Sequence, residues 1–145
     1  MYEKILVPVD GSEGAFQALK QALELQKSFN AELYILSVYS EHRMWSASVS
    51  MVNPELTGST TEPLQELAKE IAERSKQYAK DQGVEKVRSF YMGGSPARTI
   101  VKFSQDHGIN LIVLGSRGLS DAKSYFLGSV SHKVTSLAEC PVMVV

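Results

Sequence analysis

The residues best suited to bind a ligand in this chain of 145 residues are three glycines and a serine in its last third. Gly115, Gly118 and Gly128 are followed by Ser129, so the spacing is G-x2-G-x9-G-S. Glycine tolerates positive φ and has no Cβ atom, which lets a ligand lie against the backbone of Gly115 and Gly118. Gly128 and Ser129 open a predicted helix, whose unpaired N–H groups and positive dipole end attract anions. The pattern predicts a phosphate-binding loop; glycines at the turns of an ordinary strand-loop-helix connection are the simpler alternative.

The elements on either side of this loop are a buried strand and an amphipathic helix. The apolar run Leu111–Leu114 is typical of a strand covered on both faces of a parallel sheet. Val130, Val134 and Leu137 recur at helical spacing and predict the helix that follows the loop. Ser131 adds a second hydroxyl donor to the start of that helix.

The rest of the chain alternates short apolar runs with helical patterns. We expect further strands over Lys4–Asp10, Asn30–Val38, Val84–Met92 and Pro141–Val145. Three helices are predicted to turn the following residues inward: Ala15, Ala18, Leu19, Ala22 and Leu23; Leu64, Leu67, Ile71, Ser75 and Tyr78; and Ala97, Ile100, Val101 and Ser104. Ser12 or Asp10 is expected to cap the first helix, and Ser95 with Pro96 to begin the third. Tyr39–Pro63 is predicted to be a long connection, either a partly ordered flap whose Met44 and Trp45 pack on the body or on a partner, or a mobile surface segment.

This alternation predicts an α/β fold in one domain, residues 1–145. The sheet is open and five-stranded, its strands are parallel, and helices cover both faces. Ligands bind such sheets beyond the carboxyl ends of the strands, where the strand order reverses. Asp10, Val38, Gly93 and Gly115 follow or end predicted strands, so we expect four segments to meet at one crevice.

Composition excludes several classes of partner and site. The formal net charge is -1, which disfavours binding to nucleic acid or to an acidic membrane surface. No run approaches the roughly 18 apolar residues that cross a bilayer, so we expect no membrane insertion. Cys140 is the only cysteine, which rules out an internal disulfide and favours a reducing, cytoplasmic setting. It is read as a packed small hydrophobe.

Familiar nucleotide and catalytic motifs are missing from the sequence. It contains neither the Walker pattern G-x4-G-K-[ST] nor a G-x-G-x-x-G run after its first strand. The glycine-serine loop and the His-x-Gly-His signature of adenylylating α/β families are also missing. The three histidines, His42, His107 and His132, are scattered, which argues against a metal triad or a Ser-His-Asp site.

Three segments resemble the universal stress protein family: VPVDGS at Val7–Ser12, the glycine motif at Gly115–Ser129, and CPVMVV at Cys140–Val145. The resemblance spans essentially the whole chain. It implies the Rossmann-like strand order 3-2-1-4-5 and, through the glycine motif, the ATP-binding branch of the family. The segments Ala31–Val52 and Gly93–Phe103 resemble a subgroup linked to solute transporters, which suggests a regulatory protein partner.

The resemblance also implies roles for individual residues around bound ATP, or ADP or AMP. Asp10 and the backbone at Val9 would contact adenosine, and Val38 would meet adenine through its main chain. The remaining implied site residues lie beside the ribose and phosphates or complete the wall: Pro8, Ser12, Leu114, Gly115, Arg117, Gly118, Gly128, Ser129, Val130 and Ser131. Arg117 is the one cation in the loop placed to reach a phosphate, and Asp10 the carboxylate nearest a nucleotide-bound Mg2+. The roles of Asp121 and Lys123 stay open.

Two functions follow from this interpretation. The first is a stress-response module in which ATP occupancy controls oligomer state or partner binding; the second is a slow Mg2+-dependent ATP hydrolase or phosphotransferase using Asp10. No general base is evident beside the loop, which favours the first. The apolar strand Val142–Val145 would form an unprotected edge, so we expect an antiparallel homodimer through it, with a tetramer left open.

Overall fold

The fold is built on one parallel sheet. The computed structural model describes residues 1–40, 57–117 and 127–145. In the helix that begins at residue 57, side chains are described from residue 62 onward. The strands are β1 (Lys4–Pro8), β2 (Glu32–Tyr39), β3 (Val87–Gly93), β4 (Leu111–Leu114) and β5 (Val142–Val144). All adjacent pairs are parallel and the order is β3-β2-β1-β4-β5, which confirms the predicted topology.

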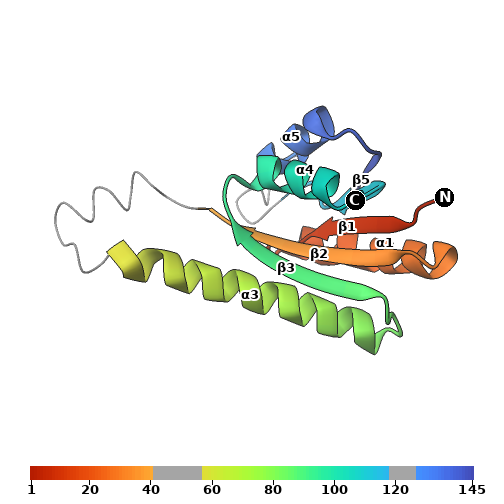
Figure 1. Cartoon of the computed structure of the whole chain (residues 1–145), viewed down its shortest axis with the longest axis horizontal. Helices are drawn as coiled ribbons and strands as arrows, with labels where there is room; N and C mark the ends of the chain where they lie inside the picture. Colours follow the sequence, from red (N-terminus) through yellow and green to blue (C-terminus); the bar gives the residue numbers. More distant parts are fainter. Residues whose placement is uncertain (41–56, 118–126) are drawn as a thin grey trace.

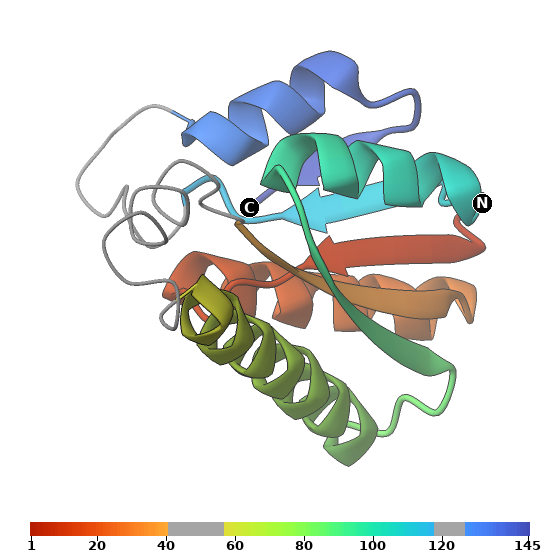
Figure 2. The ribbon, with the colours of Figure 1, turned by 60° about the vertical axis from the view of Figure 1, so that its left-hand side comes forward.

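Four described helices cover the two faces of the sheet. They are α1 (Glu13–Phe29), α3 (Thr57–Asp81), α4 (Pro96–Asp106) and α5 (Ser129–Leu137). Figures 1 and 2 show α1 and α3 on one face and α4 with α5 on the other. Strand β1 supplies both cores, because successive side chains point to opposite faces. Ile5 and Val7 pack in the core on the α1 side, while Leu6 packs with residues of α4 and α5.

The start of α1 is held by two local hydrogen bonds. Of the two predicted caps, Ser12 and Asp10, the N-cap is Ser12, whose hydroxyl oxygen accepts the Ala15 N–H at 3.2 Å. Asp10, two residues before the cap, accepts the Ser12 N–H through its Oδ1 at 2.9 Å. All five residues predicted to face inward from α1 are buried. This cap fixes the direction in which the chain leaves β1.

Helix α4 starts where the sequence predicts. Ser95 is its N-cap residue and Pro96 lies in the first helical turn, although the Ser95 side chain makes no capping hydrogen bond. Ala97, Ile100, Val101 and Ser104 are buried, as predicted.

Two predicted core positions are wrong. Leu67 is 53% exposed, whereas its neighbour Ala68 is buried and Ile71, one turn later, packs against the core. One residue along a helix is a rotation of about 100°, which turns Leu67 away from the sheet. Leu137 is 50% exposed because it is the last residue of α5, where the chain leaves the packed layer.

The connection between β2 and α3 is shorter than predicted. Helix α3 begins at Thr57 and contains Pro63, so the predicted boundary at Pro63 is wrong. Met44 and Trp45, assigned to a flap, lie outside the described residues. None of the helices in the described ranges has the length and apolar character needed to cross a membrane.

Candidate functional site

A cavity of about 310 Å³ opens at the carboxyl ends of the central strands. It lies where the order reverses, since β1 pairs with β2 on one side and with β4 on the other. Five segments line it: Pro8, Val9, Asp10, Ser12 and Ala15; Leu36, Val38 and Ser40; Pro96 and Ile100; Leu114, Gly115 and Arg117; Gly128, Ser129, Val130 and Ser131. Its volume falls at the lower end of the range for small-molecule sites, about 300–1,000 Å³.

Twelve of the thirteen residues predicted for the site line this one cavity. The thirteenth, Gly118, lies outside the described residues. Gly93 does not line the cavity, so the expectation that it joins the crevice is wrong. Gly93 ends the edge strand β3. Strand β2 lies between β3 and the point where the strand order reverses, between β1 and β4. The chain returns to the cavity only at Pro96, where α4 begins.

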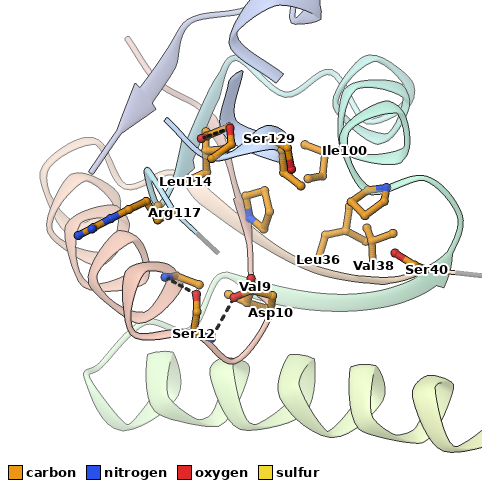
Figure 3. A pocket seen from close by; sticks show the side chains of 17 residues that line it. Val9, Asp10, Ser12, Leu36, Val38, Ser40, Ile100, Leu114, Arg117 and Ser129 are labelled. Carbon is orange, nitrogen blue, oxygen red and sulfur yellow. Dashed lines mark hydrogen bonds between the residues drawn. The ribbon is translucent and has the colours of Figure 1, made fainter. Parts of the chain in front are cut away.

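One side of the cavity is apolar. Leu36, Ile100 and Leu114 are almost fully buried, and Val38 lies half-buried at the end of β2. Figure 3 shows Leu36 and Val38 on the wall beneath Ile100, with Leu114 across the opening. Such a wall excludes water from a flat, apolar group and offers it dispersion contacts.

Sequence reasoning missed part of this wall. Ala15, Leu36, Ser40, Pro96 and Ile100 line the cavity but were not among the predicted site residues. Ala15 and Ile100 were predicted as core residues, and they are buried, yet each also borders the cavity. Hydrophobic periodicity identifies the buried face of a helix but cannot tell which part of it faces a cavity.

The opposite side of the cavity carries the start of α5. Gly128 is the N-cap, at φ -66° and ψ 166°, and provides no side-chain acceptor for the first N–H groups of the helix. The first helical hydrogen bond runs from His132 N–H to Gly128 O, at 2.9 Å. Ser129, in the first turn, is exposed on the cavity rim. A helix start of this kind offers donors and partial positive charge to an anion.

Ser131 differs from the prediction that its hydroxyl donates to a ligand. The side chain is only 3% exposed, and Oγ donates to Ser116 O at 2.8 Å and to Gly128 O at 3.0 Å. A hydroxyl has one hydrogen to donate, and these two carbonyls compete for it. The Ser131 hydroxyl is therefore engaged within the protein.

Gly115 lines the cavity, as predicted, and it also meets a packing requirement that the sequence did not reveal. Its φ is not among the positive values of the described glycines, so conformational freedom is not what requires it. A Cβ atom there would lie 2.7 Å from the carbonyl carbon of Gly14 and 3.1 Å from the Ala15 nitrogen. Conversely, a Cβ on Gly14 would lie 2.8 Å from Arg117 O. The two glycines let the start of α1 pack directly against the main chain that follows β4.

The charged residues of the cavity lie on its rim. Asp10 is half-buried, and one of its carboxylate oxygens accepts the Ser12 N–H. Arg117 is exposed, and Figure 3 shows its side chain extending away from Val38 and Ile100. Within the described residues, no three His, Cys, Asp or Glu side chains gather in a way that would hold a metal ion.

Comparison with known proteins gives a consistent result. The sequence profile of the universal stress protein family matches residues 1–145. Universal stress protein YxiE of Bacillus subtilis is 39% identical, over 100% of this chain and 99% of its own length. The solved structure of protein MJ0577 of Methanocaldococcus jannaschii is 34% identical with a TM-score of 0.78, and the match covers 100% of this chain and 96% of that one. A universal stress protein solved in complex with cAMP has the same fold, with 23% identity, a TM-score of 0.69 and coverage of 99% and 96%. The chain therefore belongs to the universal stress protein family.

Proposed function

We propose that this protein binds ATP in the cavity and acts as a stress-response module whose nucleotide occupancy controls oligomer state or partner binding. The observation that carries the proposal is that an apolar wall and an uncapped helix start face the same cavity. These two surfaces suit the two halves of a nucleotide, the base and the phosphates. The family relative solved with cAMP provides independent support for this class of ligand.

The lining residues fit a nucleotide in a defined direction. The base would lie against Val38 and Ile100, and the phosphates would meet the Ser129 hydroxyl and the first N–H groups of α5. Asp10, between these ends, offers a carboxylate acceptor to a ribose hydroxyl. A Mg2+ ion would arrive with the phosphates and keep several waters, since Asp10 is the one carboxylate among the described lining residues. ADP and AMP would use the same base wall with fewer phosphate contacts.

The same residues favour holding ATP over hydrolysing it. A hydrolase needs a base within reach of the attacking water. The described lining residues include no histidine, and their one carboxylate, Asp10, is placed at the ribose and not at the phosphates in this arrangement. We expect ATP to stay intact over hours when it is incubated with the protein and Mg2+, as followed by chromatography of the nucleotide.

A charge placed at the start of α5 tests the site. Ser129→Asp should weaken ATP binding by about tenfold or more, because the new carboxylate would repel the phosphates. It should leave the melting temperature unchanged or raised, since an acidic group at a helix N-terminus stabilises the helix by about 0.3–1 kcal/mol. Calorimetric titration with ATP and Mg2+ measures the first effect and thermal unfolding the second.

The matched control places the same charge at the other end of the same helix. Ser136 is exposed, and it lies about 10 Å along the axis from Ser129, roughly one Debye length at 0.1 M salt. Ser136→Asp should leave ATP affinity within twofold of the unmodified protein, taking about 0.4 kcal/mol as the limit. Equal affinities for ATP in all three proteins would refute the proposed phosphate position. Absence of ATP binding to the unmodified protein would refute the proposed function.

We further propose a homodimer through the β5 edge, which would provide the oligomer state under control. Among the strands of the described residues, β5 pairs with β4 alone, and its residues are half-buried. Val145 N–H donates to Leu114 O, and Pro141 O accepts from Ile112, so these residues turn their main-chain groups toward β4. Val144 is out of phase with them and turns its N–H to the free edge. An exposed apolar edge of this kind favours pairing with a second strand.

Proline substitutions test the two sides of β5 one at a time, because each removes an N–H that points either to the free edge or to β4. Val144→Pro removes an outward N–H and should convert the dimer to monomer on size-exclusion chromatography, with the fold retained. Met143→Pro is the control. Met143 lies two residues before Val145, so its N–H also points toward β4, and removing it should disrupt the pairing with β4 and lower the melting temperature. A Val144→Pro protein that stays dimeric would exclude this edge as the interface. A tetramer would add further contacts to the same dimer.

The family resemblance extends the proposal to the setting of the protein. We propose a cytoplasmic location and a regulatory protein partner such as a solute transporter. Cell fractionation tests the location. Co-purification of a tagged protein with and without added ATP tests whether any partner depends on nucleotide.

A further inference from the structure

Ser131 is one of four buried polar residues among those described, and it is the one that borders the cavity. Its Oγ reaches back along its own helix to Gly128 O and across to Ser116 O, fifteen residues earlier. Ser116 O also accepts the Gly128 N–H, at 2.6 Å. The Ser116 carbonyl oxygen thus accepts hydrogen bonds from the N-cap residue of α5, Gly128, and from the side chain of Ser131 in its first turn.

The carbonyl that receives these bonds belongs to a well-held segment. Ser116 N–H donates to Val145 O at 2.9 Å, which joins it to the end of β5. On the other side, the main chain from Gly115 to Arg117 lies against Gly14, where even a Cβ atom has no room. Ser116 is therefore fixed between α1 and β5, and it offers a rigid point of attachment for α5.

A second buried serine shows which of these bonds is unusual. Ser104 in α4 is also 3% exposed, and its Oγ donates to Val101 O, three residues earlier, at 2.6 Å. Such a bond stays within one helix and cannot orient it. Ser131 shares its single hydroxyl hydrogen between Gly128 O, the equivalent acceptor, and Ser116 O, which lies outside α5 in the segment after β4.

We propose that Ser131 is a positioning residue for the phosphate end of the cavity. Its hydroxyl fixes the first turn of α5 to Ser116, so that Ser129 and the free N–H groups of that turn face the ligand. Gly128 has no side chain that would fix this turn by capping it. The inference rests on the proposed function for its ligand, and it assigns the Ser131 hydroxyl an indirect role, whereas the sequence suggested a backbone or hydroxyl donor to the phosphates.

The test compares ATP with adenosine, which has the base and ribose but no phosphate. Ser131→Ala should weaken ATP binding by about tenfold, the equivalent of one hydrogen bond to a charged group. Its affinity for adenosine should stay within about twofold. The variant should fold, because Ser116 O keeps its bond from Gly128 N–H and no buried acceptor is left unpaired. Ser104→Ala, the matched control, should bind both ligands as the unmodified protein does.

A second measurement needs no ligand. In Ser131→Ala the Gly128 amide should exchange its hydrogen about tenfold faster, because the turn that holds it against Ser116 O is released. The Ala138 amide, bonded to Val134 O at the other end of α5, should exchange at an unchanged rate. This split separates a local release of the first turn from general loss of stability.

The outcomes are distinguishable. Equal losses of ATP and adenosine affinity in Ser131→Ala, or no loss for ATP, would overturn the positioning role. An unchanged exchange rate of the Gly128 amide in Ser131→Ala would show that Ser131 does not hold the first turn of α5 in the ligand-free protein, and would also overturn the positioning role. If the unmodified protein binds neither ligand, the proposed function fails, while the exchange measurement still decides whether Ser131 holds the first turn of α5.

Discussion

The close approach of Gly14 and Gly115 makes a sharp prediction about stability. In Gly115→Ala the added methyl carbon would lie 2.7 Å from the carbonyl carbon of Gly14 and 2.8 Å from its oxygen. Both atoms belong to the main chain, which cannot rotate away as a flexible side chain does. Helix α1 must therefore move away from the end of β4, and the well-packed core between them must adjust.

The expected magnitude follows from two opposing terms. Forcing an extra carbon into a packed interior costs about 1–3 kcal/mol. Replacing glycine by alanine at an ordinary φ stabilises by about 0.4–1 kcal/mol, because the unfolded chain loses freedom. We expect a net loss of about 1–2 kcal/mol in the free energy of unfolding. For a chain of 145 residues this lowers the melting temperature by about 3–7 °C.

Thermal and urea unfolding measure the effect, and Gly83 provides the control. Gly83 has φ +92° and nothing within 4 Å of a Cβ atom, so only backbone strain opposes a side chain there. Asn tolerates positive φ better than Ala, so Gly83→Asn should lose less stability than Gly83→Ala. At Gly115 the order should reverse, because the larger Asn side chain meets the same main chain. A Gly115→Ala protein as stable as the original would refute the packing of α1 described above.

Three further predictions concern single side chains. Ser12→Ala should lower the free energy of unfolding by about 1 kcal/mol, because it removes the α1 cap, while Ser95→Ala, which loses no capping bond, should change little. Burial, together with the hydrogen bond to Glu32, raises the pKa of Tyr34, so the stability it contributes below pH 10 is lost as pH rises through the folded value. An ultraviolet absorbance titration should show one tyrosine that ionises late, and Tyr34→Phe should lack it; a single step shared by all tyrosines would contradict this. Burial also raises the pKa of the Cys140 thiol, so iodoacetamide should alkylate it more slowly in the folded than in the urea-unfolded chain, and equal rates would contradict the prediction.

The strand order and most of the cavity wall could be predicted, because the strands and helices leave patterns within a few residues and the resemblance to a known family implies their order. The apolar run Leu111–Leu114 and the cap at Ser12 are readable within a few residues, and the structure has both. The resemblance then supplied the strand order 3-2-1-4-5, which determines which strand ends meet. Leu67 was placed inward wrongly because periodicity weights large apolar side chains over alanine, and in the structure its neighbour Ala68 is the buried residue.

The sequence by itself determined the alternation of strands and helices, the capped start of α1, and the glycine and serine that open α5. Each of these depends on the conformational preferences of residues that are neighbours in the chain. Only the tertiary structure decided that Ile100 borders the cavity, that Gly115 packs against Gly14, and that the Ser131 hydroxyl donates to Ser116 O. These contacts join residues far apart in the chain. They depend on the distance and direction between packed elements, which local preferences do not encode.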